Sequence, residues 1–147
     1  MANFTYTYGK AALDRGETAL HSADIRVKLL MTNTTAGTDD DAQTLDDITT
    51  LDEMDGTNYA EKSLAEQAVA IDTVGKRTRF TADDVTWEDL GNGTRQVTGI
   101  LIYDRRDAGL ANQVPLFYID KDPFNPGGNN FTIEWHEDGI RVHREPS

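Results

Sequence analysis

The chain has 147 residues, of which 26 are acidic and 14 are basic, so its formal net charge is -12. This charge argues against a nucleic-acid-binding surface and against docking to an anionic membrane, because both partners attract Lys and Arg. The absence of cysteine excludes disulfides, thiolate nucleophiles and cysteine-ligated metals. The length suits one domain, residues 1–147, and neither a signal peptide nor an apolar run of the roughly 20 residues that span a membrane is expected.

Residues 1–22 are predicted to form an N-terminal arm with a short helix. Phe4, Tyr6 and Tyr8 alternate with polar residues, a pattern typical of an edge strand or an extended arm. The segment Gly9–Gly16 is a short helix candidate that Gly16 would end.

The next stretch combines a clear strand with a long polar segment. Ile25–Met31 places apolar residues at every second position, which predicts a strand. Residues 32–44 predict a polar loop, and Thr44 predicts the start of a short helix because Asp47 follows three residues later. Residues 60–74 fit a helix or a strand, and we favour a strand that ends at Gly75.

Residues 85–120 contain three strand-like runs around which the rest of the chain is organised. The middle run is apolar on both faces, with Val97, Leu101 and Tyr103 predicted on one side and Ile100 and Ile102 on the other. Such a strand lies in the middle of a sheet or between two layers.

Glycines mark two special positions in this unit. Gly99, inside the middle run, indicates a bulge or a close neighbour. The pair Asn92–Gly93 predicts a tight turn that joins the first two runs as a hairpin and sets Glu88 opposite Val97.

The C-terminal residues also predict a hairpin. Residues 131–135 and 140–142 alternate apolar and polar side chains around a turn at Asp138–Gly139, which would set Trp135 opposite Val142. The same register would set Glu134 opposite His143. These short strands with little helix predict an all-β fold with one or two short helices, an antiparallel and jelly-roll-like β-sandwich of about seven or eight strands.

Residues with catalytic or metal-binding chemistry are present, but their spacing does not single out a site. Glu134, His136 and His143 could form a zinc set on one face, yet a solvated strand face with a cross-strand pair is the favoured interpretation. Residues 39–41 are three consecutive aspartates without the alternation of a calcium loop. Composition and spacing alone therefore predict a soluble acidic β domain with no visible active site, and neither a cofactor nor a metal is expected.

From Asp24 to Arg144 the chain resembles a family of small tailed-bacteriophage proteins that are encoded among virion structural genes. The matching segments are 9–13, 24–30, 45–48, 80–87, 100–104, 116–120, 126–135 and 139–144. The acidic stretch 39–59 is longer than the family's usual connection, and residues 145–147 extend beyond its usual end.

This resemblance implies a virion component without enzymatic activity. We expect a capsid decoration (cement) protein on the outer surface of the assembled head, made in the bacterial host cytoplasm. Its partner would be the major capsid protein, and a homo-oligomer such as a trimer is expected on the capsid, with neither nucleic acid nor membrane as partner.

The expected contact residues are Phe4, Tyr6 and Tyr8, because aromatic residues are enriched in interface cores and an extended arm can join a neighbour's sheet. Arg105 and Arg106, in a polar loop, are the second candidate. Alternatively the aromatic segment covers its own core, and the arginines form a solvated loop tip. The alternative function is a carbohydrate- or receptor-binding module of a tail or fibre that uses Trp87 or Trp135 as a platform, although both are predicted to be mainly buried.

Overall fold

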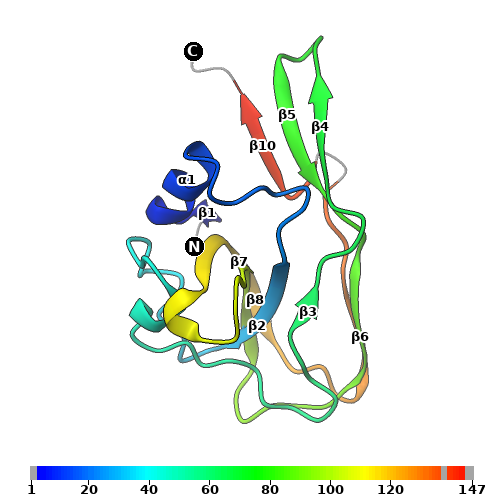
Figure 1. Cartoon of the computed structure of the whole chain (residues 1–147). Helices are drawn as coiled ribbons and strands as arrows, with labels where there is room; N and C mark the ends of the chain where they lie inside the picture. The colour runs from blue at the N-terminus through cyan, green and yellow to red at the C-terminus, as the bar shows by residue number, and fades with distance from the viewer. Residues whose placement is uncertain (1–2, 137–138, 145–147) are drawn as a thin grey trace.

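The structure, a computed structural model, describes residues 3–136 and 139–144. It confirms a mainly β fold with antiparallel sheets and one short α-helix (Figure 1). The elements in chain order are β1 Phe4–Thr5, α1 Thr7–Asp14, β2 Ile25–Met31, the 3-10 helix η1 Leu45–Asp47, β3 Lys62–Ser63, β4 Ala68–Asp72, β5 Arg77–Thr81, β6 Val85–Leu90, β7 Val97–Asp104, the 3-10 helix η2 Leu110–Asn112, β8 Val114–Phe124, β9 Asn129–Ile133 and β10 Arg141–Arg144.

The central sheet has five strands in the order β1-β8-β7-β2-β3, and each neighbouring pair is antiparallel. The predicted middle strand, β7, is the middle strand of this sheet. Side chains on both of its faces are buried, among them Ile100, Leu101, Ile102 and Tyr103. The prediction that this strand lies between two layers is confirmed.

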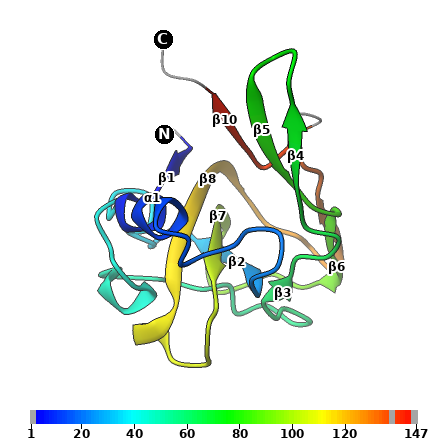
Figure 2. The ribbon, with the colours of Figure 1, turned by 45° about the horizontal axis from the view of Figure 1, so that its top comes forward.

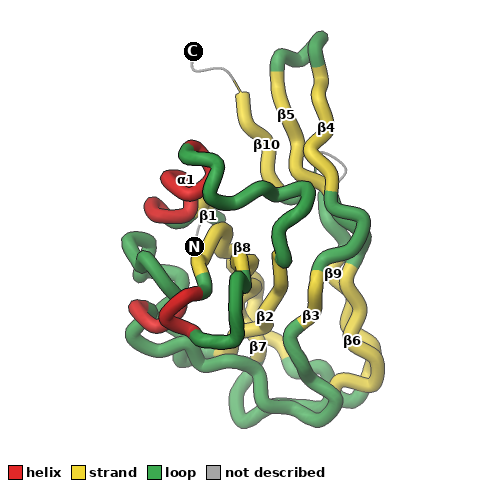
Figure 3. Tube along the Cα trace, viewed as in Figure 1, coloured by secondary structure: helices red, strands yellow, loops and turns green. Residues whose placement is uncertain are grey.

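Two hydrophobic cores lie on opposite faces of the central sheet, because side chains alternate along each strand. On one face, β2 and β7 contribute Val27, Leu29 and Ile102, which pack with Trp87 of β6. On the other face, Leu30, Leu101 and Tyr103 pack under the loop that follows β2, in a core that includes Leu45. The tube in Figure 3 shows this covering segment as mostly loop.

The prediction for Val97 is wrong, and the bulge at Gly99 explains why. The pairing of β7 with β2 sets Gly99 opposite Leu30 but Val97 opposite Met31, so β7 carries one extra residue between Gly99 and Val97. The extra residue moves Val97 onto the face of Ile100 and Ile102. Gly99 is also a close neighbour of Tyr118, since a Cβ at this position would lie 2.4 Å from the Tyr118 hydroxyl oxygen.

The predicted hairpin around Asn92–Gly93 does not form. Strand β6 pairs with β9 and not with β7. Trp87 lies opposite Phe131, and Thr86 lies opposite Thr132. The side-chain oxygen of Asn92 accepts a hydrogen bond from the backbone N–H of Gly127 at 2.7 Å, so Asn92 holds a distant turn. Burial of Trp87 against the core therefore outweighs the local turn preference.

The predicted C-terminal hairpin is also wrong. Strand β10 pairs with β5, which sets Arg141 opposite Phe80 and His143 opposite Thr78, so Trp135 and Glu134 face neither Val142 nor His143 across a strand pair. The indole N–H of Trp135 donates to the Asp83 carbonyl oxygen at 2.9 Å, which fixes the end of β9 beside the β5–β6 connection. The predicted turn residue Asp138 lies outside the described residues.

The remaining short elements follow the sequence predictions closely. β1 is an edge strand on β8, and α1 begins at Thr7, two residues before the predicted start. The side chain of Asp47 accepts from the backbone N–H of Thr44 at 3.1 Å, in the predicted capping arrangement of η1. Strand β4 precedes Gly75, as favoured. Figures 1 and 2 show β4, β5 and β10 extending together beyond the central sheet.

Candidate binding surfaces

The aromatic residues of the N-terminal arm divide between core and surface. Tyr6 is fully buried, and its hydroxyl donates to the carbonyl oxygen of Ala36 at 2.7 Å. Burial raises the pKa of Tyr6 far above its ordinary value. Phe4 is half-buried and stacks on Tyr118 with ring centroids 5.6 Å apart, whereas Tyr8, in α1, is exposed. Tyr6 covers its own core, and Phe4 and Tyr8 keep surface that a partner can reach.

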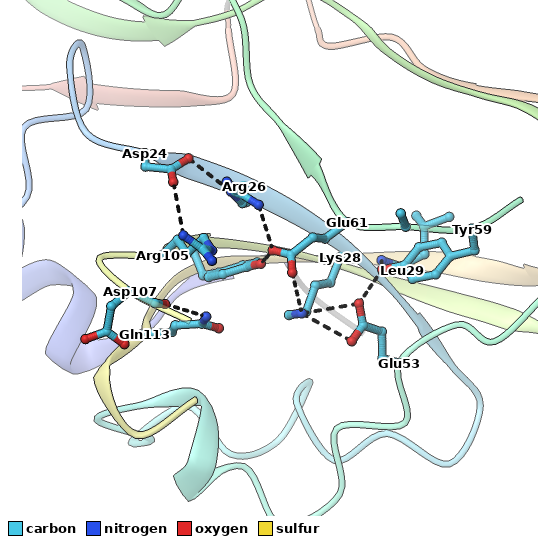
Figure 4. A network of polar contacts seen from close by, with 12 residues as sticks. Asp24, Arg26, Lys28, Leu29, Glu53, Tyr59, Glu61, Arg105, Asp107 and Gln113 are labelled. Atoms are coloured by element: carbon cyan, nitrogen blue, oxygen red, sulfur yellow. Dashed lines mark hydrogen bonds and ion pairs between the residues drawn. The ribbon is translucent and has the colours of Figure 1, made fainter. Parts of the chain in front are cut away.

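The two arginines of the loop after β7 already have partners within the chain. Arg105 is ion-paired with Asp24 at 3.9 Å, as Figure 4 shows. Arg106 is ion-paired with Asp104 at 3.3 Å, and it also donates to the Thr18 hydroxyl at 3.3 Å. Asp104 is buried and accepts from Thr18. These arginines anchor the segment after α1 to the end of β7, and any contact with a partner would be made alongside this role.

A polar network around Lys28 of β2 was not predicted from the sequence (Figure 4). Lys28 has only 5 % of its side chain exposed, and its ammonium lies 3.2 Å from both carboxylate oxygens of Glu53 and 3.7 Å from Glu61. The Tyr59 hydroxyl donates to Glu53 at 2.7 Å, and the Tyr103 hydroxyl donates to Glu61. Burial, followed by the nearby glutamate, raises the pKa of Tyr59.

This network connects the acidic stretch 39–59 to the central sheet. Glu53 belongs to this stretch, and Lys28 belongs to β2. The only sequence signal for it was a lysine within a run of apolar strand residues. Lys28 and Arg26, whose guanidinium lies 3.7 Å from Glu61, together compensate the charge of the two partly buried carboxylates, which makes the network a structural one.

A groove of about 580 Å³ lies between the edge of the central sheet at β1 and β8 and the segment that ends β9. Ile100, Phe131 and Trp135 contribute apolar surface, and Asp120 and Glu134 contribute carboxylates. Trp135 is half-buried, and its backbone N–H donates to the Asp84 side chain at 3.2 Å. The prediction of a mainly buried side chain is confirmed for Trp87, whereas Trp135 keeps some exposed surface in the groove.

The candidate metal ligands do not form a metal site in the part of the chain that the structure describes, where no group of three His, Asp or Glu side chains could hold an ion. Glu134 and His136 line the groove, and the structure describes the backbone of His143 but not its side chain. Of the three consecutive aspartates, Asp39 accepts hydrogen bonds from the Thr35 hydroxyl at 2.6 Å and from the Thr49 backbone N–H at 2.9 Å. These hydrogen bonds, the one from Thr35 first, lower the pKa of Asp39.

Comparisons of this chain with family models, curated proteins and solved structures find no match. Within residues 3–136 and 139–144, no helix has the length and apolar character needed to cross a membrane.

Proposed function

We propose that this chain is a non-enzymatic structural protein of a tailed-bacteriophage virion and that it decorates the outer surface of the assembled head. The resemblance of its strand motifs to a family of virion proteins carries the proposal. Three of those motifs lie in β2, β7 and β8, which are neighbours in the central sheet. The resemblance therefore involves the segments that build the core of the fold.

The surface of the chain offers a contact suited to this role. Phe4 and Tyr8 flank the buried Tyr6, so their exposed surface is held by an anchored segment at the sheet edge. A preorganised aromatic surface loses little entropy on binding. Repetition of the major capsid protein over the head would then multiply a modest affinity through avidity.

The test is co-sedimentation of the purified protein with purified, expanded phage heads, counting bound copies per capsid subunit. We expect saturable binding at a fixed, simple ratio. The variant Tyr8→Ser is expected to weaken binding about tenfold, and the control Glu88→Ser, an exposed position on β6, is expected to bind as the wild type does. Absence of binding to heads would overturn the decoration role.

A second candidate function is recognition of a glycan or receptor by a tail or fibre module. The observation in its favour is Trp135, which lines the groove beside Phe131 and Glu134. An aromatic face next to carboxylates is a suitable platform for a sugar ring. Binding of surface glycans that Trp135→Ala abolishes, together with no binding to heads, would favour this function over decoration.

A further inference from the structure

The hairpin formed by β4 and β5 carries apolar side chains that the fold leaves uncovered. Ile71 is 76 % exposed and Val74 is 95 % exposed, and Val69 on β4 is also exposed. They account for most of the large apolar side chains that are exposed in the described part of the chain. β4 is also the edge strand of the three-stranded sheet β10-β5-β4. An exposed apolar edge strand favours association unless a partner covers it.

The charge of this hairpin is opposite to that of the chain. Residues 68–81 contain Lys76, Arg77 and Arg79 against the single acid Asp72, within a chain of net charge -12. Arg77 is ion-paired with Asp72 at 2.9 Å, whereas Lys76 lies exposed in the turn beside Val74. The hairpin tip is therefore both apolar and basic, so a suitable partner surface is both apolar and acidic.

The groove beside β1 and β9 has these properties. Phe131 and Trp135 supply apolar walls, and Asp120 and Glu134 supply carboxylates, of which Glu134 is exposed. Lys121 also lines the groove, with its ammonium 5.7 Å from the centre of the Phe131 ring, so the acidic part of the groove is the rim at Glu134. Its volume of about 580 Å³ is within the range of roughly 300–1,000 Å³ that is typical of ligand sites, enough for the side chains at a hairpin tip.

We propose that the β4–β5 hairpin tip of one copy docks into the groove of a second copy of this chain. Ile71 and Val74 enter the apolar part of the groove, and Lys76 pairs with Glu134 at its rim. Because the two surfaces differ, the contact is head-to-tail, and repeating it builds a closed ring or an open filament. The contact does not depend on the proposed decoration role, because it involves this chain alone.

The experiment is sedimentation velocity of the full chain over a wide range of protein concentration at low salt. We expect concentration-dependent association for the wild type and a monomer for Val74→Asp, which changes a side chain that the fold does not bury. The matched control is Leu110→Asp, an exposed apolar position outside the hairpin and the groove, which is expected to associate as the wild type does. A wild type that stays monomeric throughout, or a Val74→Asp variant that associates normally, would overturn the proposal.

A charge exchange tests the pairing itself. Lys76→Glu and Glu134→Lys are each expected to reduce the association constant about tenfold or more, because each sets like charges opposite one another. The double variant, which carries both changes in one chain, restores the attraction and is expected to recover association. Failure of the double variant to recover, or single variants with no effect, would contradict the assignment of the groove as the docking site. Head binding is measured separately, so either proposal can fail without the other.

Discussion

Lys28 is the residue on which the buried polar network depends. Its ammonium contacts Glu53 and Glu61 and lies 5.2 Å from the centre of the Tyr103 ring. Without the lysine, the two carboxylates would be left partly buried and close to one another with less compensating charge.

We expect Lys28→Met to lower the free energy of unfolding by about 2 kcal/mol. This is less than the roughly 3–5 kcal/mol typical of breaking a fully buried pair, because both glutamates reach solvent. Urea unfolding followed by tryptophan fluorescence measures the change. The control Arg15→Met removes the exposed ion pair with Glu17 and is expected to cost less than about 0.5 kcal/mol. Equal losses in the two variants would show that the network does not stabilise the fold.

Single residues also show where the sequence predicted the structure well. Gly99 was predicted to mark a bulge or a close neighbour, and it does both. The alternation rule nevertheless assigned Val97 to the wrong face, because an inserted residue reverses the alternation beyond it. The sequence indicates that a bulge is present but does not say on which side of it the register shifts.

At the scale of elements, strand identity was predicted better than strand pairing. Apolar alternation predicted β2, and continuous apolar runs predicted β7 and β8, because these patterns lie within each strand. Pairing depends on which distant surface buries a side chain, and for this reason the hairpins predicted at Asn92–Gly93 and at Asp138–Gly139 are wrong, whereas β7 and β8 do pair with one another. Burial of the Trp87 side chain favours the pairing of β6 with β9, and β10 pairs with β5. The turn signal at Asn92–Gly93 was outweighed by this long-range burial.

The groove shows the same limit for candidate binding residues. Glu134, Trp135 and His136 were considered from the sequence as members of a hairpin. Their position beside Phe4 and Asp120 follows from the pairing of β1 with β8 and from the course of the chain after β9. Such a surface cannot be predicted while the strand pairing is unknown.

The loop after β2 is an element that is held by side chains instead of regular structure. Asp39 accepts hydrogen bonds from Thr35 and Thr49, and the backbone N–H of Thr50 donates to the Thr35 hydroxyl at 2.9 Å. These bonds close the loop over Leu45 and Ile48, which belong to the second core. Asp39 therefore connects Thr35 and Thr49, near the two ends of the loop that covers the second core.

We expect Asp39→Ala to destabilise the fold by about 1–2 kcal/mol, because it leaves two donors without their acceptor. The same change is expected to open the loop to proteolysis under native conditions. Asp40→Ala is the control, since the backbone carbonyl of Asp40, which accepts from the Thr7 N–H, remains in place. Unfolding by urea and limited proteolysis measure the two effects. Similar protease resistance in both variants would contradict a special role for Asp39.

At the scale of the whole molecule, titration sets the range of pH in which the fold is stable. The pKa of Asp39 and the pKa of Asp52 are both lowered, the latter first by the hydrogen bond from Arg95. A carboxyl group with a lowered pKa in the folded state stabilises the fold above its unfolded pKa of about 4, and this contribution is lost as the pH falls through the folded value. The free energy of unfolding is therefore expected to decrease below about pH 4.

Buried tyrosines are expected to cause a loss of stability at high pH. Burial raises the pKa of Tyr6, Tyr59, Tyr103 and Tyr118, so the folded state holds these protons at a pH where the unfolded chain has released them. Stability is complete below the unfolded pKa of about 10 and falls as the pH rises above it. Thermal unfolding between pH 3 and pH 11 is expected to show a plateau with a fall at each end, since in the unfolded chain these groups titrate at about pH 4 and about pH 10.

The variant Tyr6→Phe separates the hydrogen bond of this tyrosine from its titration. At neutral pH the variant is expected to lose about 1 kcal/mol, because the Ala36 carbonyl oxygen loses its donor. Above about pH 10 its stability should fall less steeply than that of the wild type, since one buried titrating group has been removed. Tyr8→Phe, at an exposed position, is the control and should leave the slope unchanged. An alkaline slope that is the same in all three proteins would show that the titration of Tyr6 does not contribute to the loss of stability at high pH.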